Sequence, residues 1–248
     1  MTRHDMRHQG EAMLRTLFGS AAQPAGLANL LTEAAYGGIW TRPGLALPDR
    51  LICSIAALGV GPRPRALRRH IGAGLEHGLG AEAIREILVQ ASLYSGFSAA
   101  EETLPLAGEV FAERGIQFPA DPPEEVSLEV LDQRGAALMA QLHGSRASEG
   151  YASPDNPVTG ELYPAAIRYG YGEIWSRPGL EHRQRALVAV AAFTALRLPE
   201  QVAKFGRSAL NVGLNRTQVI EAIIQTAPLT GFPPALNALG AIGAAFAA

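Results

Sequence analysis

Two arginines stand at equivalent places in two similar stretches of the chain, and each precedes an apolar run. Arg50 opens the run RLICSIAAL, and Arg185 opens RALVAVAAF. A guanidinium presents a planar fork of N–H donors that matches a carboxylate, so both side chains are candidates for binding an anionic substrate. A charge at the start of a helix, exposed to solvent, is the alternative interpretation.

A second pair of arginines, Arg42 and Arg177, lies in the shared motif W-[TS]-R-P-G-L with Trp40 and Trp175. A proline after the arginine restricts that arginine to an extended backbone and indicates a turn. The arginines are candidates for holding substrate oxygen atoms, and the tryptophans for the walls of a pocket. The alternative is a rigid turn that ties each tryptophan into the core.

His70 is the candidate for moving a proton. The equivalent position in the second stretch is Phe205, which indicates a buried site. A buried imidazole among arginines stays neutral near pH 7, through desolvation and like charge, and can serve as a base or a proton shuttle. His77 lies seven residues later and is expected on the same side of the helix. A structural histidine in the core is the alternative.

Gln90 and Tyr94 complete the candidate site. Tyr94 is equivalent to Leu229 in the other stretch, and it is a candidate hydrogen-bond donor to a developing oxyanion. A core aromatic is the alternative for Tyr94. Glutamine stands at the equivalent positions 90 and 225 of the two stretches. Either a substrate contact or a hydrogen bond between helices explains why both have Gln.

We expect no metal and no cofactor, because the motifs that hold them are missing from the sequence. Cys53 is the one cysteine and is interpreted as a small buried hydrophobe, with a redox role for this single thiol as the alternative. There is no H-E-x-x-H arrangement and no glycine-rich nucleotide loop. His4 and His8 are four residues apart, but we expect the start of the chain to be disordered.

The elements that position these residues form an internal repeat. Tyr36–Ala112 aligns with Tyr171–Ala247 at a constant offset of 135, and 24 of the 77 pairs are identical. Gly10–Gly19 matches Gly135–Gly144 at an offset of 125, so the second copy carries about ten extra residues in the loop-like stretch SPDNPVTGELYP. The proline-rich segment Phe118–Glu125 predicts the boundary, which gives a first repeat of residues 1–120 and a second of 121–248.

Each repeat is expected to be all-α. Apolar residues recur at helical spacing, prolines stand where helices begin and glycines where they end, and no alternating strand pattern of useful length occurs. The expected helices are Leu47–Gly59 with its counterpart Glu181–Leu196, then Pro64–Gly78, Ala81–Gly96 and Ser98–Arg114.

Charge and composition exclude several classes of protein. The formal net charge of −2 argues against a nucleic-acid binder, which normally shows a basic patch. The apolar runs are too short to span a bilayer, and the charged start does not resemble a secretory signal. We therefore expect a cytoplasmic protein with a small-molecule partner and no membrane or nucleic-acid partner.

The combined pattern resembles the carboxymuconolactone decarboxylase family. The motifs that carry the resemblance are W-[TS]-R-P-G-L, an arginine heading an apolar helix, R-H-x-x-x-x-L-x-x-G, I-R-E-I-L-x-Q and Y-S-G-F. The second copy departs from the pattern at Phe205, and both copies lack the acidic residue that many relatives carry after the arginine. The sister alkylhydroperoxidases need Cys-x-x-Cys where this chain has Arg63 and Ala66, which argues against peroxidase chemistry.

The resemblance implies helical units that assemble into trimers or hexamers, so a fused pair is expected to form a homotrimer that is a pseudo-hexamer of repeats. It also implies decarboxylation without a cofactor, as part of aromatic compound metabolism. Under this hypothesis Arg50 and Arg42 hold the carboxylate and enolate oxygens, His70 moves the proton, and Tyr94 stabilises the oxyanion. The second repeat would supply walls through Trp175, Arg177 and Arg185.

We therefore expect a cofactor-independent lyase that acts on a small carboxylated lactone or keto acid through an enolate. Two alternatives stay open. One is an isomerase, cyclase or ring-opening enzyme of aromatic or secondary metabolism on the same scaffold. The other is a non-catalytic scaffold or binding protein, favoured by the loss of the histidine in one copy.

Overall fold

The structure, a computed structural model, describes residues 2–120, 126–148, 156–160 and 162–247, and these residues form helices and no strands. The first repeat contains α1 (Arg3–Phe18), α2 (Ala28–Leu30), the π-helix η1 (Leu31–Gly37), α3 (Leu47–Gly59), α4 (Pro64–Glu76), α5 (Ala81–Ser95) and α6 (Ser98–Ala112). The second contains α7 (Leu128–His143), the 3₁₀ turn η2 (Gly144–Ser148), α8 (Tyr163–Ala165), the π-helix η4 (Ala166–Glu173), the 3₁₀ turn η5 (Ile174–Ser176), α9 (His182–Ala195), α10 (Pro199–Leu210), α11 (Arg216–Thr230) and α12 (Phe232–Ala247). The prediction of an all-α chain built from two similar helical units is confirmed.

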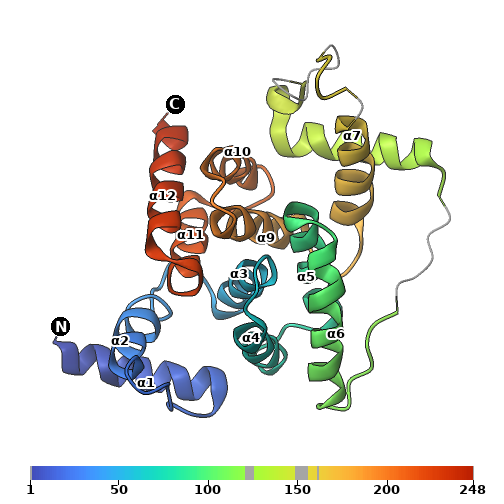
Figure 1. Cartoon of the computed structure of the whole chain (residues 1–248). Helices are drawn as coiled ribbons and strands as arrows, with labels where there is room; N and C mark the ends of the chain where they lie inside the picture. The colour runs from blue at the N-terminus through green and yellow to red at the C-terminus, as the bar shows by residue number, and fades with distance from the viewer. Residues whose placement is uncertain (1, 121–125, 149–155, 161, 248) are drawn as a thin grey trace.

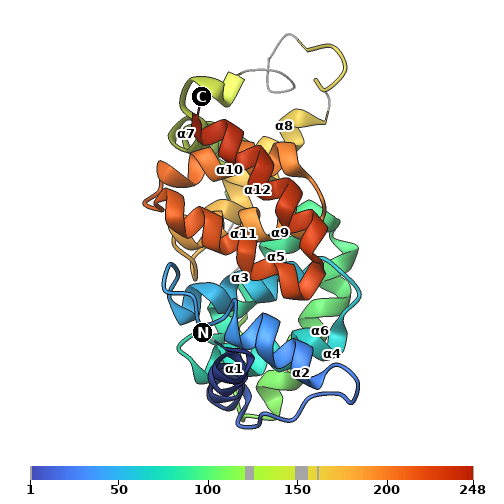
Figure 2. The same cartoon turned by 90° about the vertical axis from the view of Figure 1, so that its left-hand side faces the viewer.

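The two repeats share one core. Helix α3 of the first repeat packs against α9 and α11 of the second, and α5 also packs against α9. Figure 1 shows α3 and α9 at the centre of the molecule, and most of their residues are buried. In both views α1 and α7 lie at opposite ends (Figures 1 and 2). Each repeat therefore covers part of the apolar surface of the other.

The predicted helix boundaries agree with the structure to within two residues. Helix α3 begins at Leu47 with Pro48 in its first turn, and α4 begins at Pro64. Proline suits this position because the first N–H groups of a helix have no intrahelical partner. Helix α5 ends before Gly96, whose φ of 100° a residue with a side chain rarely adopts.

The expectation of a disordered start is wrong. Helix α1 begins at Arg3, and it carries His4 and His8. The Thr2 side chain accepts a hydrogen bond from the Asp5 backbone, and the Asp5 carboxylate accepts one from the Thr2 backbone. This reciprocal capping satisfies N–H groups that would otherwise lack partners. Arg3 and Arg7 also bind Glu33 of η1, which ties the helix to the repeat.

In both repeats, glycines let the N-terminal helix approach the π-helix closely. A Cβ at Gly10 of α1 would collide with the carbonyl oxygen of Thr32, and one at Gly37 with that of Met6. Gly135 and Gly172 play the same part where α7 crosses η4. The repeated glycines therefore preserve the same crossing of helices in both copies.

The predicted boundary between the repeats, Phe118–Glu125, lies partly outside the described residues, as does part of the predicted loop Ser153–Pro164. The described end of that loop forms the short helix α8. Among the described helices, none is both long and apolar enough to cross a membrane.

Candidate active site

Two of the predicted arginines lie in a buried ion cluster built from both repeats. We call it the Glu221 cluster (Arg42, Arg50, Ser54, Glu221 and Gln225). Arg50 on α3 donates from Nη2 to Oε2 of Glu221 over 3.0 Å, and from Nη1 to Oε1 of Gln225 over 2.9 Å. Arg42 holds the other oxygen of the same carboxylate, with 2.6 Å between Nη2 and Oε1. Helix α3 of one repeat is thus joined to α11 of the other.

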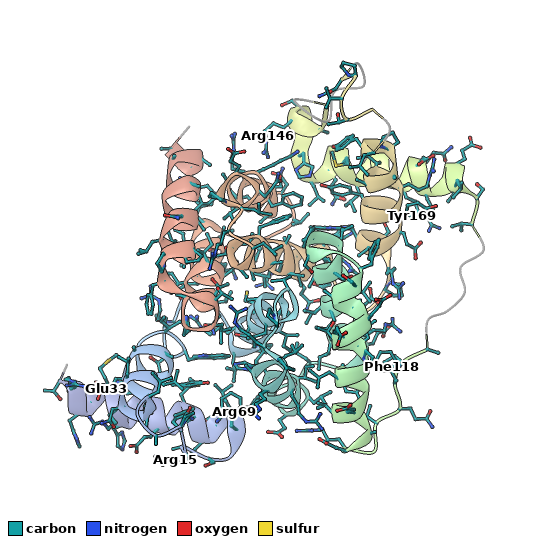
Figure 3. All side chains as sticks on the ribbon, viewed as in Figure 1. Arg15, Glu33, Arg69, Phe118, Arg146 and Tyr169 are labelled. Atoms are coloured by element: carbon teal, nitrogen blue, oxygen red, sulfur yellow. The ribbon has the colours of Figure 1, made fainter. Side chains whose placement is uncertain are left out.

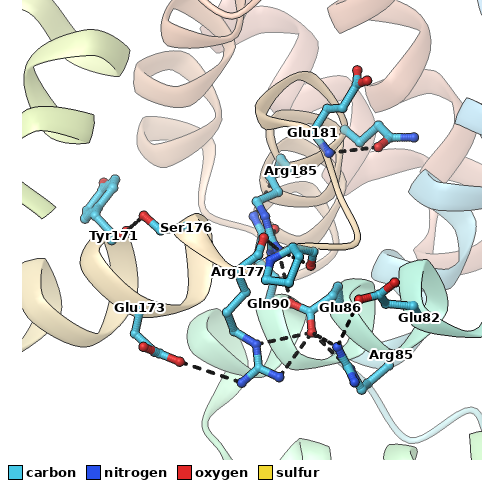
Figure 4. A network of polar contacts seen from close by, with 12 residues as sticks. Glu82, Arg85, Glu86, Gln90, Tyr171, Glu173, Ser176, Arg177, Glu181 and Arg185 are labelled. Carbon is cyan, nitrogen blue, oxygen red and sulfur yellow. Dashed lines mark hydrogen bonds and ion pairs between the residues drawn. The ribbon is translucent and has the colours of Figure 1, made fainter. Parts of the chain in front are cut away.

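The other two predicted arginines form the equivalent cluster around Glu86 (Figure 4). The Glu86 cluster consists of Arg85, Glu86, Gln90, Arg177 and Arg185. Arg185 on α9 donates to Oε2 of Glu86 over 3.0 Å, and Nη2 of Arg177 lies 3.2 Å from Oε1. Arg185 also contacts Gln90, as Arg50 contacts Gln225. The two clusters are therefore related by the internal repeat, with donor and acceptor repeats exchanged.

Both central arginines already have protein partners on several sides. Arg50 also donates to the carbonyl oxygens of Leu45 and Arg42, and Arg185 donates to that of Arg177. The Arg50 residue is 1% exposed, and Arg185 is fully enclosed. These contacts fit arginines that hold the two repeats in place. That Arg42, Arg50, Arg177 and Arg185 bind a substrate stays a prediction.

Burial and pairing act against each other in these clusters. Burial raises the pKa of Glu221, but hydrogen bonds from Arg42 and Arg50 outweigh it and hold that pKa below its ordinary value. In the other cluster, burial lowers the pKa of Arg185, and Glu86 opposes that change. The carboxylates are therefore needed to keep the buried guanidinium charges tolerable.

His70 lies in a cluster of rings, the His70 ring cluster (Phe18, Tyr36, Trp40 and His70). Its ring centroid is 5.4 Å from that of Phe18 and 5.9 Å from that of Trp40. Nδ1 is 2.8 Å from the carbonyl oxygen of Ala66, so Nδ1 carries the proton and Nε2 presents a lone pair. Nε2 is buried and has no hydrogen-bond partner among the described residues. Burial lowers the pKa of His70 to about 4, so the imidazole is neutral near pH 7, as predicted from its sequence context.

The second repeat has a matching set, the His143 ring cluster (Tyr94, His143, Tyr171, Phe193, Trp175 and Phe205). His143 comes from the end of α7, and its ring centroid is 5.1 Å from that of Phe205. Nδ1 is 2.7 Å from Ser208 Oγ, and Nε2 accepts from the Tyr171 hydroxyl over 3.0 Å. Burial lowers the pKa of His143 to about 3. This imidazole has partners on both nitrogens, unlike that of His70.

The repeats have exchanged a histidine and a phenylalanine. Phe18 of α1 is equivalent to His143 of α7, and His70 of α4 is equivalent to Phe205 of α10. Both pairs meet edge to face, with ring centroids 5.4 and 5.1 Å apart. Each repeat therefore keeps one buried imidazole next to one phenyl ring. The second repeat, expected to be degenerate at its histidine position, still carries a histidine in this place.

Tyr94 and Gln90 lie with the second repeat and not with His70. The Tyr94 hydroxyl accepts hydrogen bonds from Trp175 Nε1 and from Gln90 Nε2, each over 3.0 Å. Its ring packs on Phe193 with 4.4 Å between centroids. The expectation that one centre combines His70, Tyr94 and Trp175 is therefore wrong. The C-terminal part of α5 packs against α9 of the second repeat, so the Tyr94 ring lies among the side chains of the second repeat.

His77 and Cys53 lie outside both ring clusters. His77 follows the end of α4 and its Nε2 lies 2.9 Å from the carbonyl oxygen of Thr16, which accounts for this side chain without a substrate. Cys53 is enclosed in α3, and burial raises the pKa of its thiol well above the ordinary range. A buried neutral thiol fits the interpretation of Cys53 as a small hydrophobe.

A basic hollow of about 240 Å³ opens beside the His70 ring cluster, and its lining includes Phe18, three arginines (Arg68, Arg69 and Arg114) and two glutamates (Glu76 and Glu113). The guanidinium carbon of Arg69 lies 3.7 Å from the centre of the Phe18 ring. Figure 3 shows Arg69 between α4 and the end of α1. Arg68 and Arg114 pair with glutamates, whereas Arg69 has no carboxylate partner among the described residues. Phe18 therefore separates an unpaired positive charge from the His70 imidazole.

The sequence held a signal for three residues that our predictions left out. Glu86 and Glu221 are identical at the offset of 135, within stretches already compared. His143 lies opposite Phe18 in the match of Gly10–Gly19 with Gly135–Gly144. Among the described residues, no group of three or more His, Cys, Asp or Glu side chains is placed to hold a metal ion.

Comparison with known proteins agrees with the repeated architecture. The sequence model of the carboxymuconolactone decarboxylase family matches twice, over residues 25–109 and 160–244. A 4-carboxymuconolactone decarboxylase of Acinetobacter baylyi is 33% identical over 99 residues, which are 40% of this chain and 70% of the relative. The nitrosuccinic acid decarboxylase npaB of Metarhizium robertsii is 23% identical over 116 residues, or 47% of this chain and 80% of the relative.

A solved structure from Burkholderia xenovorans, provisionally described as a gamma-carboxymuconolactone decarboxylase subunit, has the same fold over nearly its whole length. The TM-score is 0.56, with 97% of this chain and 96% of that chain covered. The identity is 21%, so this likeness concerns the fold alone.

Proposed function

The chain belongs to the carboxymuconolactone decarboxylase family, and from this premise we propose that it is a lyase that decarboxylates a small organic acid through an enolate. The relatives named above support the reaction type. The observation in this structure that supports it is the buried, unpartnered Nε2 of His70 within a ring of aromatic side chains.

The surroundings of His70 suit the loss of carbon dioxide. A carboxylate moved from water into an aromatic pocket loses hydration, whereas the charge of the enolate that follows is dispersed. The same negative charge raises the pKa of a neighbouring imidazole, because opposite charge favours the imidazolium. His70 then takes a proton from solvent on Nε2 and transfers it to the enolate carbon. The neutral imidazole is restored, and the product has gained one proton in place of carbon dioxide.

We propose Arg69 as the contact for the substrate carboxylate. It lies next to His70 in the chain, lines the basic hollow and has no carboxylate partner among the described residues. Arg50 and Arg42 already bind Glu221, so we assign them to positioning the two repeats. The ring of Phe18 stands between the hollow and the imidazole, and a substrate would have to displace it.

Turnover of 4-carboxymuconolactone and of nitrosuccinate, followed as release of carbon dioxide, tests this proposal. His70→Phe should abolish turnover while the protein stays folded, because Phe205 fills the equivalent place in the second repeat. Arg69→Gln should raise KM more than it lowers kcat. Unchanged turnover in His70→Phe would refute the role of His70. Failure of the wild type on both acids and on related keto acids would refute the decarboxylase assignment.

An isomerase is the second candidate, because a neutral imidazole with a free Nε2 lone pair is already in the form of a base. An isomerase would exchange a carbon-bound proton of the substrate with deuterium from solvent and release no carbon dioxide. Measuring deuterium exchange and carbon dioxide release on the same compounds distinguishes isomerisation from decarboxylation.

We also propose that the chain is a cytoplasmic homo-oligomer, a trimer of fused pairs. Large exposed apolar side chains occur at equivalent positions of the two repeats, at Phe97 and Phe232 and at Leu27 and Leu162. Repetition of exposed apolar residues supports an interface that both repeats use. Light scattering on the purified chain gives the mass directly, and Phe97→Glu combined with Phe232→Glu should lower it.

A further inference from the structure

A hollow of about 400 Å³ lies in the second repeat, between the turn that joins α9 to α10 and the start of α12. Its volume is in the range that takes up a small organic molecule. The walls are mainly apolar, and the polar side chains that line the hollow are Thr194, Arg197, Thr230 and Asn237. The lining includes Phe193, Thr194, Arg197, Thr230, Asn237 and Ala238.

Arg197 lines this hollow, is exposed to solvent and has a strained backbone. Helix α9 ends in a motif in which the Leu198 N–H donates to the carbonyl of Phe193 and the Arg197 N–H donates to that of Thr194. The residue in the position of Arg197 must adopt a left-handed conformation, and glycine is usual there. Arg197 has φ of 63° and is the one described residue other than glycine with a positive φ. The chain thus keeps an arginine where a glycine would relieve the strain.

The Arg197 guanidinium has no partner within the described protein. Among the described residues, no ion pair or side-chain hydrogen bond involves Arg197, and the same is true of Asn237, which lines the same hollow. The described lining contains no acidic side chain. An unpaired guanidinium that lines the same hollow as an amide and apolar side chains is suited to an organic carboxylate.

The equivalent hollow of the first repeat has the opposite charge. It is lined by Arg63 together with Glu101, Glu102 and Glu109. Pro62 stands at the position of Arg197, and Glu102 at that of Asn237. Three carboxylates against one arginine would repel an anion. The repeats therefore share a hollow of similar placement, and only in the second repeat does positive charge exceed negative charge along the lining.

The hollow in the second repeat reaches the His143 ring cluster through one side chain. Phe193 forms part of the lining, and its ring centroid lies 4.4 Å from that of Tyr94 and 4.9 Å from that of Phe205. A ligand seated on Phe193 would change the surroundings of Tyr94, which accepts the hydrogen bond of Trp175.

We propose that this hollow is a binding site for a small carboxylate with an apolar or aromatic body. The carboxylate pairs with Arg197 and accepts from the Asn237 amide, and the body packs on Phe193 and Ala238. This site is separate from the His70 ring cluster and does not depend on the reaction proposed there. The difference in charge between the two hollows makes the binding specific to the second repeat.

Titration calorimetry of the full chain with benzoate, and with benzamide as the uncharged control, tests the site. Benzoate should bind at millimolar concentration or below, and benzamide at least tenfold more weakly. Arg197→Gly should weaken benzoate binding at least tenfold. The melting temperature of this variant should be equal to or higher than that of the wild type, because glycine relieves the strained φ. Asn237→Glu, which copies the first repeat at an exposed position, should weaken benzoate similarly.

Arg63→Gly is the matched control in the first repeat and should leave binding unchanged. His70→Phe should also bind benzoate like the wild type, so a failed decarboxylase assignment would not affect this result. Absence of benzoate binding to the wild type would overturn the proposal. Equal affinity in the wild type and Arg197→Gly would overturn it as well. A lower melting temperature in Arg197→Gly would show that the arginine stabilises the turn, and would contradict a strained backbone that is kept for binding.

Discussion

Glu86 is a carboxylate on which three arginines converge, so Glu86→Gln removes the negative charge and keeps the shape of the side chain. Glu86 and Arg185 have fully buried side chains, that of Arg85 is 3% exposed and that of Arg177 is 17% exposed. After the substitution at least two guanidinium groups stay charged with little water and no carboxylate at the centre. We expect this single change to destabilise the whole fold, because Glu86 joins helices of both repeats.

The size of the effect follows from the burial. Removing one partner of a buried ion pair costs about 3–5 kcal/mol, mainly because the remaining charge is uncompensated. Glu221→Gln should lower the free energy of unfolding by about 3 kcal/mol, because the Arg42 side chain is 43% exposed and can regain water. Glu86→Gln should lower it by about 5 kcal/mol. With an m-value of about 3 kcal/mol per M urea, each of these losses would lower the urea concentration at the unfolding midpoint by about 1 M or more.

Urea unfolding followed by fluorescence measures both variants, since Trp40 and Trp175 report on the first and second repeat. Glu82→Gln is the matched control, because Glu82 lies one turn from Glu86 and its side chain is 52% exposed. An exposed pair contributes about 1 kcal/mol or less. A loss below about 1 kcal/mol in both Glu86→Gln and Glu221→Gln would refute the view that these clusters hold the repeats together.

Three further predictions concern packing, thiol chemistry and pH. Gly172→Ala should lower the free energy of unfolding by about 1–3 kcal/mol, because the added Cβ collides with the carbonyl of Leu131; Gly240→Ala meets open space on α12, and an equal loss there would contradict the close approach. Cys53 should resist a thiol reagent in the native protein and react fully in urea, because burial raises its pKa; fast native labelling would contradict the enclosed position. Burial lowers the pKa of His70 to about 4, against an ordinary value of 6.5, so the unfolded chain binds the proton more readily and stability should fall as the pH drops from 6.5 towards 4. Urea titrations across that range should show a smaller fall in His70→Phe, and an identical fall would place the effect elsewhere.

Local sequence patterns were sufficient for the helices of each repeat. Proline in the first turns of α3 and α4, and glycine after α5, mark the ends because these residues act through the backbone alone. The start of α1 was missed because the polar helix gains its stability from Thr2, Asp5 and ion pairs with a distant glutamate. Propensity and periodicity carry no information on such contacts.

The candidate site was predicted less well, because its geometry depends on how two repeats meet. The sequence identified Arg50, Arg185 and Tyr94, but the glutamates and the tryptophan that they contact lie in the other copy, 81 to 171 residues away. Alignment of the repeats indicated which side chains are equivalent. It did not indicate that each arginine would face the glutamate of the opposite copy, nor that Tyr94 would leave the surroundings of His70.

The crossed pairing of arginine and glutamate has a consequence for how the two halves can change over generations. A half released from its neighbour would expose a buried cation without its anion, so neither half is expected to persist alone. Covalent linkage fixes their stoichiometry at one to one and replaces a diffusional encounter by a local one. An assembly of identical subunits must place the same residue in every copy. The fused chain is free of that symmetry, and so it can hold a histidine on different helices and give its two hollows opposite charge.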